Sequence, residues 1–393
     1  MKKTIAIFLS LCLSFFAFLT GDLSVLAQDV EIQAPSAILM EAKTGTVIYE
    51  KNPEEIRSPA SITKIMTLLL AFEAIEQKKI SLADEVVTSA YAKSMGGSQV
   101  FLEEGEIQTV DTLLKCIAVA SGNDASVCIA EHIAGTEGEF INMMNAKAAE
   151  LGMVNTHFMD CCGLSNSEEH YTTARDVAIM SKELITGYPQ VFNYTTIWME
   201  DITHVTNKGE STFTLSSTNK LLKQYPYANG LKTGSTDKAK YCLSATALKE
   251  DVQLIAVVMG APDYKVRFED CRKLLDYGFS KVHFYEEEKK ENYAKVEVRG
   301  GIDREVIVEY KDGFVYLDLE GRDLSKISKE TTLPEYVKAP LEKGEKVGEI
   351  SYFLDDKKIG QVDLVASQNV LKAGLGDYFR RGFGKWLLGT EEL

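Results

Sequence analysis

The chain has 393 residues, of which 45% are hydrophobic and 26% are charged, and its formal net charge is −15. This length allows one to three domains with a sizeable buried core, and the composition is that of an ordinary globular protein. Lysine and arginine form no block longer than a few residues, so the clustered positive surface of a nucleic-acid-binding protein is not predicted.

Residues 1–27 have the pattern of a secretory signal peptide. Lys2 and Lys3 precede an apolar run from Thr4 to Leu19, and Val25-Leu26-Ala27 supplies an approximate small-residue cleavage site. An uncleaved anchor helix is the alternative interpretation. We predict an exported protein that is cut after Ala27.

Residues 28–285 are predicted to form an α+β domain. Apolar runs around Lys43-Thr-Gly45 predict a hairpin over 37–49, and a second hairpin is predicted over 243–259 with its turn at 249–251. A buried helix is predicted from Ser61, and a capping box at Thr173–Asp176 predicts a helix that ends near 185. Further helices are predicted at 110–133, interrupted at 121–124, at 140–151 and at 271–279. Strands at both ends with helices between them predict a sheet covered by helices.

The sequence changes in character at the charged break Glu286–Glu291. Short alternating segments follow, at 293–298, 305–310 and 347–352, and turns such as Lys311-Asp-Gly313 separate them. This period-two alternation predicts a small all-β domain over residues 286–367.

The tail, residues 368–393, combines an apolar stripe with basic residues. The stripe follows helical spacing through Leu371, Leu375, Tyr378, Phe379, Phe383, Trp386 and Leu387. Such a helix suits an anionic membrane surface, and the alternative is a helix docked on the protein. The segment is too interrupted by charge to span a bilayer.

Six cysteines remain after the signal segment: Cys116, Cys128, Cys161, Cys162, Cys242 and Cys271. Export permits disulfides, but no small-domain framework is present, and adjacent cysteines rarely bond to each other without strain. We predict buried free thiols. The cysteines and histidines have none of the spacings of a zinc site.

The stretch Ser61-Ile-Thr-Lys64 puts a serine and a lysine on one face of the predicted helix. A serine hydroxyl is a poor nucleophile unless a base is adjacent. Lysine can be that base only if burial or a neighbouring cation lowers its pKa, and the apolar residues that follow Lys64 would bury it. An ordinary helix start with Ser61 as N-cap is the alternative.

Two more polar motifs lie downstream. Ser121-Gly-Asn123 interrupts an apolar segment, where polar groups need partners, and a buried hydrogen-bonded turn is the alternative interpretation. Gly230-Leu-Lys-Thr-Gly-Ser235 precedes the predicted strand Tyr241–Leu248. A glycine there would let a ligand backbone approach the strand edge, whereas the alternative is a surface turn with a solvated lysine.

The order S-x-x-K, S-x-N, K-T-G occurs in penicillin-binding proteins and class A β-lactamases. Over its whole length the chain resembles the low-molecular-mass penicillin-binding proteins that are D-alanyl-D-alanine carboxypeptidases. This resemblance implies a β-lactamase/transpeptidase-like catalytic domain. The residues that carry it are Ser58–Lys64, Ser121–Ala125, Asn155–Phe158, Thr173–Asp176, Gly230–Ala239 and Leu274–Phe279.

The resemblance implies an enzyme that removes the terminal D-alanine from peptidoglycan stem peptides. Lys64 would take the proton of Ser61, which attacks the D-Ala-D-Ala carbonyl. Ser121 would relay protons between Lys64, the leaving group and Lys232, and Asn123 would orient the substrate amide. β-Lactams, which mimic the substrate, would acylate Ser61.

The same resemblance implies how the substrate is held. Lys232 and Thr233 would bind the terminal carboxylate, and the backbone N–H groups of Ser61 and Ser235 would form the oxyanion hole. Gly234, in the same K-T-G motif, is implied as a substrate-binding residue, and Arg267 corresponds to a family arginine near that carboxylate. No metal or organic cofactor is implied. The protein would act at the outer face of the cytoplasmic membrane, in cell-wall biogenesis and cell shape, peripherally anchored by its tail.

Three other functions share parts of this pattern. A class A β-lactamase fits less well, because no E-x-x-L-N segment lies between Ser121 and Lys232, and Glu168-Glu169 is followed by His-Tyr-Thr. A DD-endopeptidase of the same fold would cut cross-bridges, and a non-catalytic penicillin-sensing or wall-binding protein would release nothing. Product analysis separates these alternatives.

Overall fold

The computed structural model describes residues 30–206 and 209–380. The predicted signal segment, Cys12 and the tail stripe beyond residue 380 therefore lie outside the described residues.

A five-stranded antiparallel sheet is the base of the first region, with the strand order β2-β1-β9-β8-β7. Both predicted hairpins are confirmed: β1 (Ser36–Glu41) pairs with β2 (Val47–Lys51), and β8 (Lys240–Lys249) pairs with β9 (Val252–Ala261). The K-T-G motif precedes the predicted strand, which is β8, and it also lies within a further strand, β7 (Ala228–Thr236), at an edge of the sheet.

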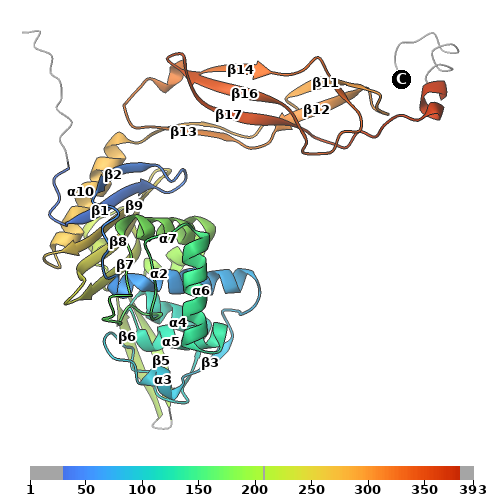
Figure 1. Ribbon diagram of the computed structural model, residues 1–393. Helices are drawn as coiled ribbons and strands as arrows, with labels where there is room; N and C mark the ends of the chain where they lie inside the picture. Colours follow the sequence, from blue (N-terminus) through green and yellow to red (C-terminus); the bar gives the residue numbers. More distant parts are fainter. Residues whose placement is uncertain (1–29, 207–208, 381–393) are drawn as a thin grey trace, which may run out of the picture. The chain divides into compact units, whose positions relative to one another are not determined.

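Helices cover both faces of this sheet (Figure 1). Helix α10 (Val266–Lys281) packs on one face and α7 (Ala174–Gly187) on the other, beside α2 (Lys64–Glu76). Nearly every residue of α2 is buried, as an all-round hydrophobic helix should be. A 3₁₀ turn, η1 (Ala60–Thr63), precedes α2 and carries Ser61, and no side chain caps either element. The alternative in which Ser61 is an N-cap is therefore wrong.

The other predicted helices are present. The predicted interruption falls between α4 (Val110–Ala118) and α5 (Asn123–Ala134). Helix α6 (Glu137–Glu150) starts earlier than predicted, because the Thr136 hydroxyl caps it. Thr173 caps α7 by accepting from the Asp176 N–H.

Several shorter elements complete this region. The β5–β6 hairpin was not predicted, because its sequence is largely polar and carries no apolar run. The elements are β3 (Glu85–Val87), α3 (Ala90–Lys93), β4 (Ile107–Thr109), η2 (Pro189–Val191), α8 (Phe192–Thr195), β5 (Met199–Thr206), β6 (Gly209–Ser216) and α9 (Leu221–Gln224).

The second region is all-β, as predicted. A six-stranded sheet has the order β14-β16-β17-β12-β11-β15, and β10 pairs with β13. Phe314 and Tyr352 stack in its core, with ring centroids 3.7 Å apart. The elements are β10 (His283–Glu287), β11 (Ala294–Arg299), β12 (Glu305–Tyr310), β13 (Phe314–Asp318), η3 (Leu324–Lys326), β14 (Ser328–Thr332), β15 (Tyr336–Lys338), β16 (Lys346–Leu354) and β17 (Lys357–Ala366).

The described part of the tail is helical over residues 375–380. Leu375 and Phe379 are 82% and 77% exposed, so their side chains do not pack on the protein. Within the described ranges, no helix is both long and apolar enough to cross a bilayer.

The six cysteines predicted to be buried free thiols are all buried and unpaired. That prediction is confirmed.

Candidate active site

The turn that carries Ser61 is held between two glycines. Gly163 has a φ of +82°, and an added Cβ there would lie 1.8 Å from the Ala60 carbonyl oxygen and 2.9 Å from the Ser61 nitrogen. A Cβ on Gly234 would lie 3.0 Å from the Ile62 nitrogen. Glycine is therefore needed at both positions for η1 to fit between β7 and the loop at 160–165. At Gly234 this close protein contact is a second reason for glycine, beside the predicted approach of a ligand.

Lys64 is fully buried and makes three contacts. Its Nζ lies 3.2 Å from Ser61 Oγ, 2.6 Å from Asn123 Oδ1 and 2.6 Å from the Cys162 carbonyl oxygen. Burial lowers the pKa of Lys64 below its ordinary value. This is the condition that the sequence analysis set for a lysine base.

A second lysine faces the second serine. Lys232 on β7 is 1% exposed, and its Nζ donates to Ser121 Oγ at 2.9 Å and to the Thr233 carbonyl oxygen at 3.0 Å. Burial, with Lys64 and then Arg267 nearby, holds the pKa of Lys232 well below its ordinary value. Ser121 has a φ of +62°, an uncommon conformation for serine that is typical of functional sites.

Asn123 links the first lysine to a neighbouring loop. Its Oδ1 accepts from Lys64, while its Nδ2 donates to the Gly96 carbonyl oxygen at 2.7 Å. Its backbone N–H donates to the Ser98 carbonyl oxygen at 2.8 Å. These bonds fix the orientation of the amide at the start of α5.

The remaining predicted residues lie along or behind β7. Thr233 is buried, with its hydroxyl 2.7 Å from that of Thr218, and Ser235 is exposed at the sheet edge. Arg267 is nearly buried on α10, where its Nη1 donates to the Gly234 carbonyl oxygen at 3.3 Å. Its Nε is buried without a hydrogen-bond partner. The structure thus brings together Ser61, Lys64 and Asn123, pairs Ser121 with Lys232, and sets Arg267 against the backbone of β7.

Sequence analysis missed the Cys162 carbonyl. It contacts Lys64 as closely as Asn123 does, but the contact uses the backbone. No residue-type pattern marks a backbone acceptor, so no sequence signal could have found it.

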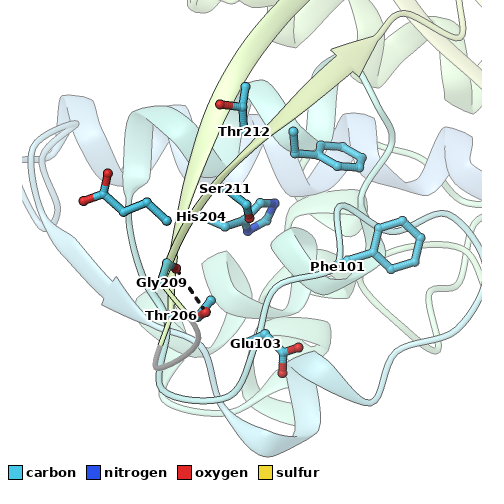
Figure 2. A pocket seen from close by; sticks show the side chains of 9 residues that line it. Phe101, Glu103, His204, Thr206, Gly209, Ser211 and Thr212 are labelled. Atoms are coloured by element: carbon cyan, nitrogen blue, oxygen red, sulfur yellow. Dashed lines mark hydrogen bonds between the residues drawn. The ribbon is translucent and has the colours of Figure 1, made fainter.

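A separate cavity of about 300 Å³ opens between the loop at 101–103 and the β5–β6 hairpin. Figure 2 shows Phe101 and His204 among the residues that line it. The imidazole Nδ1 of His204 lies 2.7 Å from the buried carboxylate of Glu106. None of the predicted site residues lines this cavity, so it is not where the three motifs meet.

Comparison with known proteins identifies the family. Residues 24–263 match the D-alanyl-D-alanine carboxypeptidase family, and residues 279–372 match the family of the penicillin-binding protein 5 C-terminal domain. The chain belongs to the D-alanyl-D-alanine carboxypeptidase family.

Relatives and solved structures agree with this assignment. The chain is 42% identical to the D-alanyl-D-alanine carboxypeptidase DacF of Bacillus subtilis over 355 residues, which cover 90% of each chain. It is similar to the crystal structure of penicillin-binding protein 5 from Haemophilus influenzae, with 31% identity and a TM-score of 0.75, covering 87% of this chain and 98% of that one. The ampicillin-bound penicillin-binding protein D2 of Listeria monocytogenes is 28% identical, with a TM-score of 0.56, covering 64% of this chain and 99% of that one.

Proposed function

We propose that this protein is a serine-type D-Ala-D-Ala carboxypeptidase that trims peptidoglycan stem peptides through a Ser61 acyl-enzyme. The observation that carries the proposal is the set of hydrogen-bond partners around Lys64. The family assignment supports the same activity.

Burial shifts Lys64 toward the neutral amine, and a neutral amine can satisfy all three of its partners. A neutral amine has two N–H donors and one lone pair. The Asn123 amide oxygen and the Cys162 carbonyl oxygen are both acceptors, at 2.6 Å, and they use the two donors. The lone pair is then left for the third neighbour, the Ser61 hydroxyl at 3.2 Å. Lys64 can therefore act as the general base.

Acylation follows from this arrangement. Ser61 Oγ gives its proton to Lys64 and forms a bond to the D-Ala-D-Ala carbonyl carbon, while the oxygen takes negative charge. The backbone N–H groups of Ser61 and Ser235 stabilise that charge. The C–N bond then breaks, and D-alanine leaves with the proton that Lys64 took from Ser61, relayed through Ser121, whose Oγ lies 2.9 Å from Lys232 Nζ. Water hydrolyses the acyl-enzyme and restores the Ser61 hydroxyl.

The substrate carboxylate is assigned to Lys232 and Thr233, with Arg267 behind the strand. A carboxylate beside Lys232 would favour its charged form and so oppose the effect of burial on its pKa. The carboxylate would thus restore the cation that binds it. Asn123 Nδ2 gives one hydrogen to the Gly96 carbonyl oxygen, and its second hydrogen would orient the substrate amide.

A product assay tests the activity. A soluble peptide ending in D-Ala-D-Ala should yield free D-alanine, whereas a DD-endopeptidase would split cross-linked dimers and a sensor would release nothing. A penicillin should bind covalently, by analogy with the ampicillin-bound relative. Dimer cleavage without D-alanine release would contradict the proposed reaction.

We also propose that the protein is exported and is held on the outer face of the cytoplasmic membrane by its tail. The exposed Leu371, Leu375 and Phe379 support this, because no residue within 30–206 or 209–380 covers them. The basic residues Lys372, Arg380, Arg381 and Lys385 would meet anionic headgroups, each contributing about 1 kcal/mol.

Flotation with anionic liposomes tests the anchor. The full chain should float, and a chain that ends before Leu371 should remain in solution. Activity on a small peptide should survive the truncation, because the catalytic motifs end with K-T-G. Equal flotation of both forms, or none, would contradict the anchor.

A further inference from the structure

A buried histidine connects the turn that carries Ser61 to the loop that contacts Lys64. His170 is 1% exposed, and its Nε2 lies 3.0 Å from the hydroxyl of Thr63, the residue directly before Lys64. On the other side of the ring, the Met159 N–H donates to Nδ1 at 2.9 Å. No motif included this residue in the candidate site.

These two bonds define the state of the imidazole. A backbone N–H can only donate, so Nδ1 must hold a lone pair. Nε2 then carries the hydrogen and donates to the Thr63 hydroxyl, which makes the ring neutral. Burial lowers the pKa of His170, which agrees with that tautomer.

The loop after Met159 is a compact turn around one carboxylate. Asp160 accepts hydrogen bonds from the backbone N–H groups of Cys162, Gly163 and Ser165. Burial works against ionisation of Asp160, but the charge of a protonated His170 and, with the neutral ring, these backbone N–H groups lower its pKa from the ordinary value. The turn presents the Cys162 carbonyl to Lys64. One short segment, held by the Asp160 hydrogen bonds, therefore connects the Met159–His170 bond to the Cys162–Lys64 bond.

We propose that His170 is a positioning residue for the reaction. Its neutral ring holds the loop at 159–165 so that the Cys162 carbonyl orients the Lys64 amine toward Ser61, and protonation of the ring releases this hold. The inference rests on the proposed function, because it assumes that Lys64 is the general base. It differs from the family's three motifs, since His170 would touch neither the substrate nor the nucleophile.

Protonation would break the Met159 bond for a simple reason. The imidazolium carries hydrogens on both nitrogens, so Nδ1–H would face another N–H donor. Asp160 favours the charged ring, whereas His157 and Lys238 oppose it. On its Nε2 side, the His170 ring contacts the uncharged hydroxyl of Thr63, the last residue of η1. The Phe158 and His170 rings also pack edge to face.

Acylation by a fluorescent penicillin, measured between about pH 5 and 8, tests the proposal. His170→Asn places an amide oxygen near the position of Nδ1, keeps an acceptor for Met159 and cannot titrate. We expect a rate near that of wild type at the alkaline end and a shallower fall toward acid. His170→Gln places its amide near the position of Nε2 and loses that acceptor. It should acylate about ten- to a hundredfold more slowly across the range, with the initial penicillin affinity unchanged.

The matched control is His157→Gln. His157 lies in the same segment and bonds to the Glu169 carbonyl oxygen, but it does not contact Thr63. Its substitution should leave the rate at the alkaline end unchanged, which would exclude a general effect of removing a nearby imidazole. The fall toward acid should begin at a higher pH, because His157→Gln removes a group that opposes protonation of His170.

Folding is checked by thermal melting of each variant. Where a His170 variant does not fold, Thr63→Val tests the same contact through the partner of His170 Nε2. Valine keeps the shape of the threonine side chain and removes its hydroxyl. If His170→Gln acylates at the wild-type rate and with the wild-type pH profile, the inference is wrong. If His170→Gln does not fold, the same result in Thr63→Val would overturn it. Failure of the wild-type protein to react with penicillin would instead refute the proposed function.

Discussion

Two regions of the molecule withdraw ionisable groups from solvent, but one surrounds them with neutral partners and the other with charged ones. In the first region, Lys64 and Lys232 are fully buried among neutral oxygens, and burial lowers both pKa values. In the all-β region, Glu287 accepts from the Tyr310 and Tyr352 hydroxyls and is paired with Lys290 and Lys329.

The pKa shifts have opposite consequences for charge. Burial raises the pKa of Glu287, but the lysine and tyrosine hydrogen bonds outweigh it and bring the pKa to about 2, so the carboxylate stays charged. The two buried lysines are instead driven toward the neutral amine. A buried charge with partners serves stability, whereas a buried amine held neutral is ready to take a proton. The direction of the shift therefore separates the structural cluster from the chemical one.

The largest effect is expected at the nucleophile. Ser61→Ala should abolish the covalent penicillin adduct, because no other hydroxyl lies beside Lys64 in the set of contacts that the structure gives it. Intact-protein mass spectrometry should show an increase of one drug mass in the wild-type protein only. An adduct that persists in a folded Ser61→Ala protein would refute the assignment.

Removing the base should have the next largest effect. Lys64→Ala should slow acylation at least about a hundredfold, the scale of general-base assistance. Lys64→Arg should do no better, because a guanidinium stays protonated near neutral pH. Stopped-flow measurement of penicillin acylation gives the rates. Acylation by either variant within about tenfold of wild type would show that Lys64 is not the base.

These two predictions depend on residues that sequence analysis found. The three motifs identified Ser61, Lys64, Ser121, Asn123 and Lys232, because side-chain chemistry at fixed spacing leaves a pattern. The hairpins and the buried helix α2 followed from apolar runs. The groups that position these side chains could not be predicted from the sequence. The Cys162 carbonyl is a backbone group, and His170 acts through Thr63 and Met159, which only the fold brings near it.

The start of α6 and the position of K-T-G show a further limit. Apolar spacing predicted α6 from Phe140, but the helix begins at the polar Glu137 after its Thr136 cap. K-T-G precedes the predicted strand, now β8, but the sequence did not predict that it also lies in the edge strand β7, where Gly234 packs on the backbone of η1. In both cases a contact outside the local apolar pattern determined the structure: a capping bond set the start of α6, and tertiary packing placed K-T-G in a strand.

In the all-β region, Glu287→Gln should cost stability and leave chemistry intact. The neutral amide loses its two lysine partners, and hydrogen bonds to a charged group contribute about 2 kcal/mol. Urea unfolding should report the loss, while the penicillin acylation rate stays at the wild-type value. The matched control is Glu288→Gln, because Glu288 is the exposed neighbour. A slower acylation by Glu287→Gln in the folded state would break the separation between the two regions.

The smallest expected effect is on how the acylation rate and the free energy of unfolding depend on pH. Lys64 must be neutral to act, so acylation should fall as pH drops through its lowered pKa, whereas Glu287 titrates only as pH falls from about 4.5 toward about 2. Glu287 has an ordinary pKa of 4.5 and a folded pKa of about 2, so the folded state binds fewer protons between these values. Its contribution to the free energy of unfolding is therefore fully present above about pH 4.5 and is lost as pH falls toward about 2.

The difference in unfolding free energy between wild type and Glu287→Gln, measured at several pH values, tests this assignment. It should be constant near neutral pH and should shrink only below about pH 4.5. Acylation by both proteins should decline together as pH falls, because Lys64 is the same in both. A stability difference that does not change down to about pH 2 would show that the charge on Glu287 is not what holds the cluster together. In that case, the two tyrosine hydroxyls alone would account for it, and the contrast between a charged structural cluster and a neutral chemical one would fail.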